Sequence, residues 1–326
     1  MLMPFRLFAA MSITLFLLFG FLFAILAAVG YFFAISGYVI VALAILMVFF
    51  QWLIGPKIIW LTTNMRLLGK DEYPWLRRTV EDLCKKYKVP MPKLALSRVG
   101  APNAFVFGRT PSGATLAVTQ GLLDSLTQEE AKSVVAHEVG HIKHKDMVVM
   151  TIVSAIPIIT YFVARFMLFA PRDSEKKQAG AAIAVGAIAF IIYFITNLLV
   201  LYLSRLREYY SDNFSGSATK PHNLASALAK ITYGLGMAPK QEKTGSARYF
   251  YIADPIEATG EIARFSSHYA DMHISESEVK EAIEWERKNP LMKFMEIFRT
   301  HPLTYKRIAR LQELERETSK SRIEAT

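Results

Sequence analysis

Two histidines flank a glutamate in the sequence HEVGH at 137–141, and these residues are the ones best suited to chemistry. On a helix, four residues advance about 400°, so His137 and His141 point the same way one turn apart and can bind one metal ion. Glu138, about 100° round the helix, can contact a water molecule at that ion without binding the ion. The pattern is typical of zinc hydrolases, and the alternative is an accidental surface pair on an ordinary helix.

The segment that starts at Thr127 predicts a helix that carries this motif. The Thr127 hydroxyl can accept a hydrogen bond from the amide of Glu130, and the Glu130 carboxylate can accept one from the amide of Thr127, an arrangement that starts helices. We therefore expect His137 and His141 to lie on one regular helix.

A catalytic zinc site needs three protein ligands and an open position, so a third ligand must be found. The extended pattern with glycine at 144 and histidine at 147 fails, because the chain has His144 and Met147 there. His144 would lie a further turn along the helix, too far for the same ion. Asp146, on a continuous helix, would point about 140° away from His141. The third ligand must therefore come from further along the chain.

Long apolar runs predict that the chain crosses a membrane four times. The segment from Leu7 to Pro56 holds 50 residues and no charge. As one helix it would be roughly 75 Å long, more than twice a bilayer core of about 30 Å, so we expect it to fold back on itself. Two further apolar runs follow, and the predicted organisation is a hairpin at 1–56 with spans at about 8–29 and 34–55, and a hairpin at 147–203 with spans at about 147–170 and 179–203. A cleaved signal peptide ending near Ala27 is the alternative for the first span.

The distribution of basic residues predicts which side of the membrane each part occupies. Lys57, Arg66 and Lys70 follow the second span, and two arginines follow the fourth, whereas the loop between the third and fourth spans is nearly balanced in charge. Because Lys and Arg are retained on the cytoplasmic side, we expect a multi-pass protein of the plasma (inner) membrane with both termini and the active site in the cytoplasm.

The polar blocks 57–146 and 204–326 would then form one cytosolic domain. In the first block, Leu76, Val80 and Leu83 recur at helical spacing and predict a helix over 74–87. The segments PMPKLALSRVG, NAFVFG and ATLAVTQG predict short strands of a small β-sheet. The second block is mostly helical, with a looser aromatic segment at 246–255 and a last helix from 305 to about 317. The fold class is a mainly α membrane protein with an α+β cytosolic domain.

Glu208 is the first downstream carboxylate to return to the cytosolic side, in SRLREYYSD after the fourth span. Asp212, four residues later on the same helical face, can accept the outer N–H of a metal-binding histidine and fix its tautomer. The alternative is that the two carboxylates form a membrane-surface anion pair that balances Arg205 and Arg207.

Three motifs in order now indicate a family. HEVGH immediately before a span, SRLREYYSD at the exit of the next span, and RTHPLTYKRIARL near the C-terminus together resemble the HtpX branch of the zinc metallopeptidases, which is related to the CAAX prenyl endopeptidases. The resemblance covers essentially the whole chain. It implies a zincin-like (gluzincin) protease domain that holds one Zn²⁺ through His137, His141 and Glu208.

The resemblance also implies roles for residues that spacing alone does not mark. Asp212 would support a zinc ligand, and His301 would lie at the active site and stabilise the developing oxyanion. Asn103 resembles a substrate-binding segment beside the cleft, and we expect the strand at 115–119 to be the edge that pairs with a peptide. Ser211 stands where the family usually has a small alanine.

The predicted activity is zinc-dependent endopeptidase action on misfolded or damaged membrane proteins, with Glu138 as general base. An intramembrane site-2-type protease is one alternative, although the many charges between 127 and 146 favour the membrane surface. A non-catalytic zinc-binding scaffold or chaperone is another, and the intact Glu138 argues against it. The partners would be unfolded or membrane-embedded polypeptides and the lipid bilayer, and the sequence does not indicate an oligomeric state.

Composition excludes two other classes of protein. The hydrophobic fraction of 52% and the mean hydropathy of +0.26 are too high for a soluble or disordered chain. The net charge of +10 comes without a nucleic-acid-binding motif, so we expect no nucleic acid partner. The single cysteine, Cys84, cannot form an internal disulfide, and the two lysines after it predict a surface position.

Overall fold

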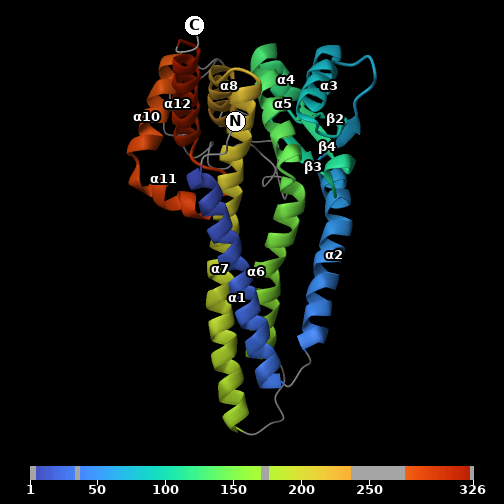
Figure 1. Ribbon diagram of the computed structural model, residues 1–326, viewed down its shortest axis with the longest axis vertical. Coiled ribbons are helices and arrows are strands. Elements are labelled where there is room, and N and C mark those ends of the chain that lie inside the picture. The colour runs from blue at the N-terminus through green and yellow to red at the C-terminus, as the bar shows by residue number, and fades with distance from the viewer. Residues whose placement is uncertain (1–4, 34–36, 170–175, 236–275, 324–326) are drawn as a thin grey trace. The chain divides into compact units, whose positions relative to one another are not determined.

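The computed structural model describes residues 5–33, 37–169, 176–235 and 276–323. The aromatic segment at 246–255 lies outside these residues. Figure 1 labels the helices and strands. In chain order they are α1 (Phe5–Phe33), α2 (Gly37–Thr62), β1 (Met65–Leu67), α3 (Pro74–Tyr87), β2 (Lys93–Ser97), β3 (Ala104–Phe107), η1 (Pro111–Gly113), β4 (Thr115–Thr119), α4 (Gln120–Ser125), α5 (Gln128–Lys143), α6 (Asp146–Phe169), α7 (Lys176–Ala218), α8 (Pro221–Leu235), α10 (Glu276–Lys288), α11 (Pro290–Met295), η4 (Glu296–Phe298) and α12 (Thr304–Ile323).

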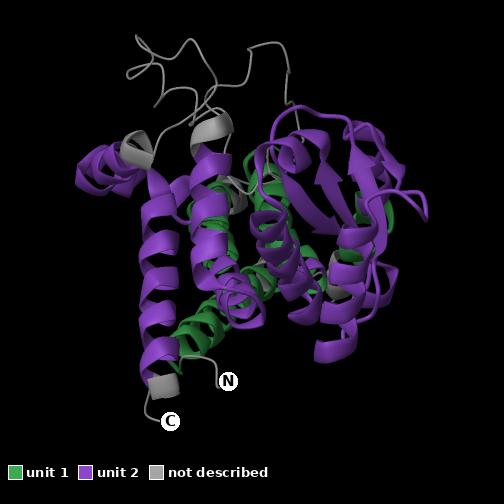
Figure 2. Ribbon diagram, turned by 90° about the horizontal axis from the view of Figure 1, so that it is seen from above, with its two compact units in different colours: residues 1–55, 148–206 green, residues 56–147, 207–326 purple. Residues whose placement is uncertain are grey.

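The chain divides into two compact units, each made of two separate stretches of sequence, which Figure 2 shows in different colours. Unit 1 comprises residues 1–55 and 148–206, and unit 2 comprises residues 56–147 and 207–326.

Unit 1 consists of long apolar helices. Within the described residues, four helices are long and apolar enough to cross a membrane: α1, α2, α6 and α7. Leu18 of α1 packs with Val153 of α6 and Leu203 of α7, whereas Phe16 and Phe23 of α1 are exposed, as expected of a lipid-facing surface. The prediction of four apolar spans is confirmed, although α7 extends well past residue 203, where we expected the fourth span to end.

Unit 2 contains a four-stranded mixed sheet in the order β1-β2-β4-β3. β2 and β4 are parallel, and the outer strands β1 and β3 are antiparallel to their neighbours. The predicted strands are therefore present, and β1 is an additional strand that the sequence analysis missed.

The expectation that residues 115–119 form the edge of the sheet is wrong. β4 lies between β2 and β3, and all five of its residues are buried. β3 precedes β4 in the chain but turns back along its outer side, so β4 becomes an inner strand. The nearly continuous apolar sequence TLAVT is typical of a strand that is covered on both faces.

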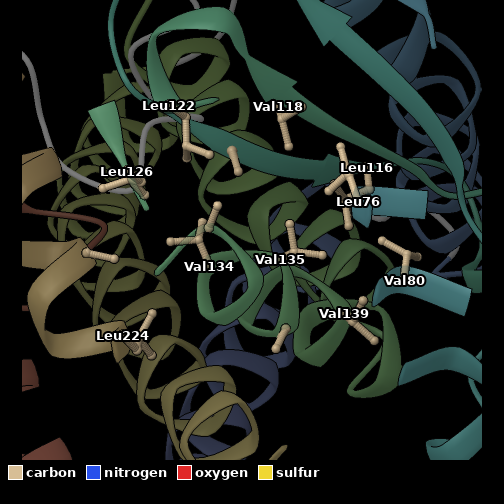
Figure 3. Packing of buried hydrophobic residues seen from close by; sticks show 14 of the residues in the cluster. Leu76, Val80, Leu116, Val118, Leu122, Leu126, Val134, Val135, Val139 and Leu224 are labelled. Atoms are coloured by element: carbon tan, nitrogen blue, oxygen red, sulfur yellow. The ribbon is translucent and has the colours of Figure 1, made fainter. Parts of the chain in front are cut away.

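A hydrophobic core joins the sheet to the helices of unit 2. Figure 3 shows some of its residues, which come from α3, β4, α4, α5 and α8 and from the turn after α4. Val134, Val135 and Val139 place α5 at the centre of this core, so the helix that carries HEVGH is buried along most of its length. Such packing holds the motif on a rigid element.

The N-terminus of α5 has the predicted capping box. The Thr127 hydroxyl accepts a hydrogen bond from the Glu130 amide, and the Glu130 carboxylate accepts one from the Thr127 amide at 2.8 Å. The same carboxylate also accepts hydrogen bonds from Ser226 and Lys230 of α8 at 2.6 and 2.9 Å. One buried side chain thus starts α5 and ties it to α8.

Cys84 is buried, and the prediction of a surface position for it is wrong. The lysines that follow it are exposed, but Cys84 shares the buried face of α3 with Leu76, Val80 and Leu83. Helical periodicity was therefore a better guide than the adjacent charges.

This burial predicts a slowly reacting thiol. Burial raises the pKa of the Cys84 thiol to about 11. Because the thiolate is the reactive form, alkylation by iodoacetamide at pH 8 should be about 100-fold slower than for an ordinary cysteine with a pKa near 9. The measurement is the rate of carbamidomethylation by mass spectrometry, with protein unfolded in guanidinium as the control. Equal rates in the folded and unfolded protein would contradict the buried position.

Candidate metal centre

The HEVGH histidines lie on α5, and α7 passes close beside them. A Cβ atom added to Gly140 would lie 3.2 Å from the Ser211 Cα and 3.1 Å from a ring carbon of Phe214. Only glycine at this position permits α7 to approach so closely without displacement. The close approach brings Glu208 and Asp212 of α7 to the histidine pair.

Three side-chain groups converge on one point. The Nε2 atoms of His137 and His141 are 3.1 Å apart. Glu208 Oε2 lies 3.4 Å from the Nε2 atom of His137, and Glu208 Oε1 lies 3.5 Å from that of His141. Ligand atoms at a tetrahedral zinc ion lie about 3.3 Å from one another, because bonds of about 2.0 Å meet there at the tetrahedral angle. The two histidine nitrogens are close to the separation that such an ion requires, and each Glu208 oxygen lies at a similar distance from one of them.

Glu138 lies beside this group and is 3% exposed. One carboxylate oxygen of Glu138 and one nitrogen from each of the two histidines lie within 4.8 Å of one another. Burial raises the pKa of Glu138, so its carboxylate binds a proton more readily than one in water does. These are the properties of a proton acceptor.

The outer nitrogen of His137 faces Asp212. The distance from His137 Nδ1 to Asp212 Oδ1 is 3.0 Å, and Arg307 of α12 donates two hydrogen bonds to Asp212, at 2.9 and 2.7 Å. Arg307 Nη1 also lies 3.2 Å from Glu208 Oε2. Arg307 is therefore a cation beside Glu208 and Asp212 that the sequence analysis missed. Arg207 pairs with a different acid.

That acid is Asp146, and its predicted position was wrong. We assumed a continuous helix, but α5 ends at Lys143, Lys145 has a φ of +58°, and α6 begins at Asp146. This turn brings Asp146 Oδ2 to 2.6 Å from His141 Nδ1, and Arg207 Nε donates to Asp146 Oδ1 at 2.6 Å. A carboxylate backed by an arginine therefore faces the outer nitrogen of each histidine.

Ser211 also contacts the site. Its hydroxyl lies 3.1 Å from His141 Nδ1, on the side where α7 packs against α5. The serine at this family position therefore adds a polar contact to a histidine, and α7 packs closely on α5 with the serine present.

His301 lies in the loop between η4 and α12, which buried carboxylates hold in place. Glu286 accepts hydrogen bonds from the amides of Thr304 and Tyr305, and Glu296 accepts one from the amide of Leu303. His301 Nε2 lies 3.7 Å from Glu208 Oε1. Burial lowers the pKa of His301, which favours its neutral form.

Two other residues of interest lie outside this cluster of side chains. Asn103 is buried just before β3, where its backbone N–H donates to the Thr119 hydroxyl at 2.8 Å. This bond joins it to the sheet and does not test its predicted role in substrate binding. His144 caps α5 and packs its ring against Tyr210 and Phe214, and burial lowers its pKa to about 4.

The electrostatics of the histidine pair suit a cation. Burial alone would lower the pKa of His137, but the carboxylates of Asp212 and Glu208 raise it to about 9, whereas burial lowers the pKa of His141. Without a metal, His137 therefore carries a proton at neutral pH, and a metal ion would replace that proton. Glu208 Oε2, although buried, has no hydrogen-bond partner of adequate geometry among the described residues. A buried oxygen of this kind, 3.4 Å from His137 Nε2, fits a metal ligand.

Comparisons with known proteins identify the relatives of this chain. The profile of Peptidase family M48 matches residues 70–315. The chain belongs to peptidase family M48. It is 42% identical over 228 residues to a Protease HtpX homolog of Methanothermobacter thermautotrophicus, a match that covers 69% of this chain and 85% of that protein. It is 31% identical over 308 residues to a Protease HtpX homolog of Pyrococcus furiosus, covering 92% and 95% of the two chains.

A solved structure also resembles the fold. The crystal structure of S. mikatae Ste24p matches with a TM-score of 0.52 at 18% identity, covering 94% of this chain and 67% of that one. Membership of family M48 makes the chain a membrane metalloprotease and implies a metal cofactor.

The contact between Asp146 and His141 predicts an effect on metal affinity. The Asp146 carboxylate can only accept, so it holds the proton on His141 Nδ1 and leaves Nε2 free. In Asp146→Asn, the amide can donate to Nδ1 and favour the proton on Nε2. We expect Zn²⁺ to bind about 10- to 100-fold more weakly, measured by competition with a chromophoric chelator.

The matched control is Glu72→Gln, which makes the same change in an exposed pair with Arg66. Its affinity should be unchanged. The melting temperature of the metal-free protein separates an effect on the fold from one on the histidine. Equal zinc affinity in Asp146→Asn and the unmodified protein would contradict the role of Asp146 in holding the proton on His141 Nδ1.

Arg307 predicts an effect on stability. It is buried against Asp212 and Glu208, so Arg307→Met would leave two buried carboxylates without their cation. We expect the metal-free protein in detergent to melt lower by roughly 10 °C or more, followed by tryptophan fluorescence. Arg310→Met, in the next turn of α12, should change the melting temperature little. An equal decrease in melting temperature in both variants would refute the view that Arg307 stabilises the fold by pairing with the two buried carboxylates.

Proposed function

We propose that the protein is a zinc-dependent endopeptidase in which His137, His141 and Glu208 hold the metal. The observation that carries this proposal is a set of short distances between groups on α5 and α7. They are 3.1 Å between the two histidine Nε2 atoms, 3.4 Å from His137 Nε2 to Glu208 Oε2, and 3.5 Å from His141 Nε2 to the other Glu208 oxygen, Oε1. Asp212 and Asp146 fix the ring orientation of the two histidines. A zinc ion bound there would polarise the scissile carbonyl and acidify a water molecule.

Glu138 is the general base of this proposal. It takes a proton from the attacking water and passes it to the amine that leaves when the peptide bond breaks. Its raised pKa suits both steps, because a base must release the proton that it has accepted. The buried position also keeps bulk water from competing for the carboxylate.

His301 has the position of a second polar group at the reacting centre. Its Nε2 atom lies on the side of Glu208 that faces His141, and the Thr300 hydroxyl lies 3.0 Å from its Nδ1. With a proton on Nε2, the neutral ring can donate a hydrogen bond to the oxyanion that develops on the substrate. We assign it this role.

We further propose that the substrates are misfolded or damaged membrane proteins, cleaved at the cytoplasmic face of the inner membrane. The apolar helices support a location in the membrane, and the excess of Lys and Arg after the second and fourth spans supports the cytoplasmic orientation. Asn103, just before β3, is assigned to substrate binding.

Two substitutions test the roles of the carboxylates. Glu138→Gln should bind stoichiometric zinc but lose at least about 1,000-fold of its casein-cleaving activity in detergent, because the amide cannot accept the proton. Glu208→Ala should lose the zinc as well. Bound metal is measured by mass spectrometry after dialysis against a chelator.

The matched control is Glu129→Gln on the same helix, whose carboxylate is 66% exposed and pairs with Lys132. It should retain both zinc and activity. Stoichiometric zinc in Glu208→Ala at micromolar free metal would refute the ligand assignment, and casein cleavage by Glu138→Gln would refute the base. Failure of the unmodified protein to cut casein, a soluble substrate, would instead favour cleavage within the membrane.

A further inference from the structure

The segment Pro290–Phe298, formed by α11 and η4, has its polarity reversed. Its inward-facing side chains are Met292 and the charged Glu296, which are 7% and 9% exposed. Apart from Lys293, its outward-facing side chains are apolar, with exposed fractions of 63% for Leu291, 57% for Phe294 and 38% for Met295. Ile297 and Phe298, at 40% and 44%, continue this surface. We call these five side chains the apolar face of α11 and η4.

Contacts of Glu296 hold the segment in this orientation. Its carboxylate accepts a hydrogen bond from the Leu303 amide at 3.2 Å and pairs with Lys306 of α12. Turning the segment to bury Phe294 would break both contacts and expose Met292. The rings of Phe294 and Phe298 instead pack on each other, with centroids 5.9 Å apart.

Apart from α2, no other described part of unit 2 has a continuous apolar surface of this kind. Among its described residues outside α2, the other large exposed hydrophobic side chains are Leu67 and Met91, which are far apart in sequence and lie on different segments. Single exposed side chains need no explanation, but a continuous apolar surface indicates a partner.

Basic side chains flank the apolar face. Arg287 and Lys288, which end α10 just before α11, have side chains 57% and 75% exposed, and Lys293 is exposed within α11. Large apolar side chains flanked by lysine and arginine are typical of segments that lie in the interface of an anionic bilayer.

We propose that the apolar face of α11 and η4 inserts into the lipid bilayer at its interface. Unit 2 continues directly into the apolar helices of unit 1 at residues 55–56, 147–148 and 206–207, so the chain itself holds it at a membrane surface. The apolar face ends at Phe298, three residues before His301, so its insertion fixes the His301 loop at the level of the lipid headgroups. This proposal does not depend on the identity of the metal or on catalysis.

Site-specific fluorescence in lipid nanodiscs tests whether the apolar face of α11 and η4 inserts into the bilayer. The background is Cys84→Ala, which removes the single cysteine. Phe294→Cys and Leu291→Cys place a bimane label on the apolar face, and Glu81→Cys places one on an exposed position of α3 as the matched control. Because the replaced side chains are exposed, all three variants should fold.

Nanodiscs of phosphatidylcholine and phosphatidylglycerol are prepared with and without bromine on the acyl chains, since bromine quenches only by contact. We expect brominated lipid to reduce the fluorescence at 294 and 291 at least about twofold and to leave that at 81 unchanged. Iodide in the buffer should quench the label at 81 more strongly than the labels at 294 and 291.

Two results would overturn the proposal. Labels at 294 and 291 that iodide quenches but brominated lipid does not would place the apolar face in water. Labels that neither reagent quenches would show that protein covers it, and disulfide-linked dimers of Phe294→Cys would identify a second copy of the chain as that cover.

Discussion

The structure of unit 2 depends on keeping ionised groups buried beside two imidazole rings. Glu208 and Asp212 lie in a dry interior, where an unpaired carboxylate is strongly destabilising. Arg307 contacts both of them, and Arg207 contacts Asp146 behind the second histidine. Such charges are stable only when their partners are in place, so the pairing constrains where α5, α7 and α12 lie.

This constraint explains why residues distant in sequence form one cluster. α5 is fixed from one side by the apolar core and at its start by Glu130, whereas Gly140 lets α7 approach its other side. The arginines then connect α12 and the start of α6 to the same two histidines. The rings therefore have defined orientations before any metal binds, which reduces the rearrangement that binding requires.

The sequence predicted the elements that depend on local periodicity or on the length of an uncharged apolar run. The helix over 74–87, the capped helix at Thr127, three strands and four apolar spans followed from patterns within single segments. The errors arose where distant segments decide the outcome. Nothing local shows that β3 covers the outer side of β4, that the chain turns at Lys145, or that Arg307 reaches Asp212. The proximity of Glu208 to the two histidines was predicted because the expected membrane topology restricted which carboxylates could reach them.

The same demand for buried partners accounts for the apolar face of α11 and η4. Glu286 and Glu296 turn inward because they bind the amides that begin α12 and so hold the His301 loop. A short segment cannot bury both its carboxylate and its large apolar side chains, and the latter are therefore left outside. In water this arrangement would be unfavourable, since several large apolar side chains would remain hydrated. At a bilayer it is favourable, and the position of the His301 loop is then stabilised both by carboxylates within the protein and by lipid outside it.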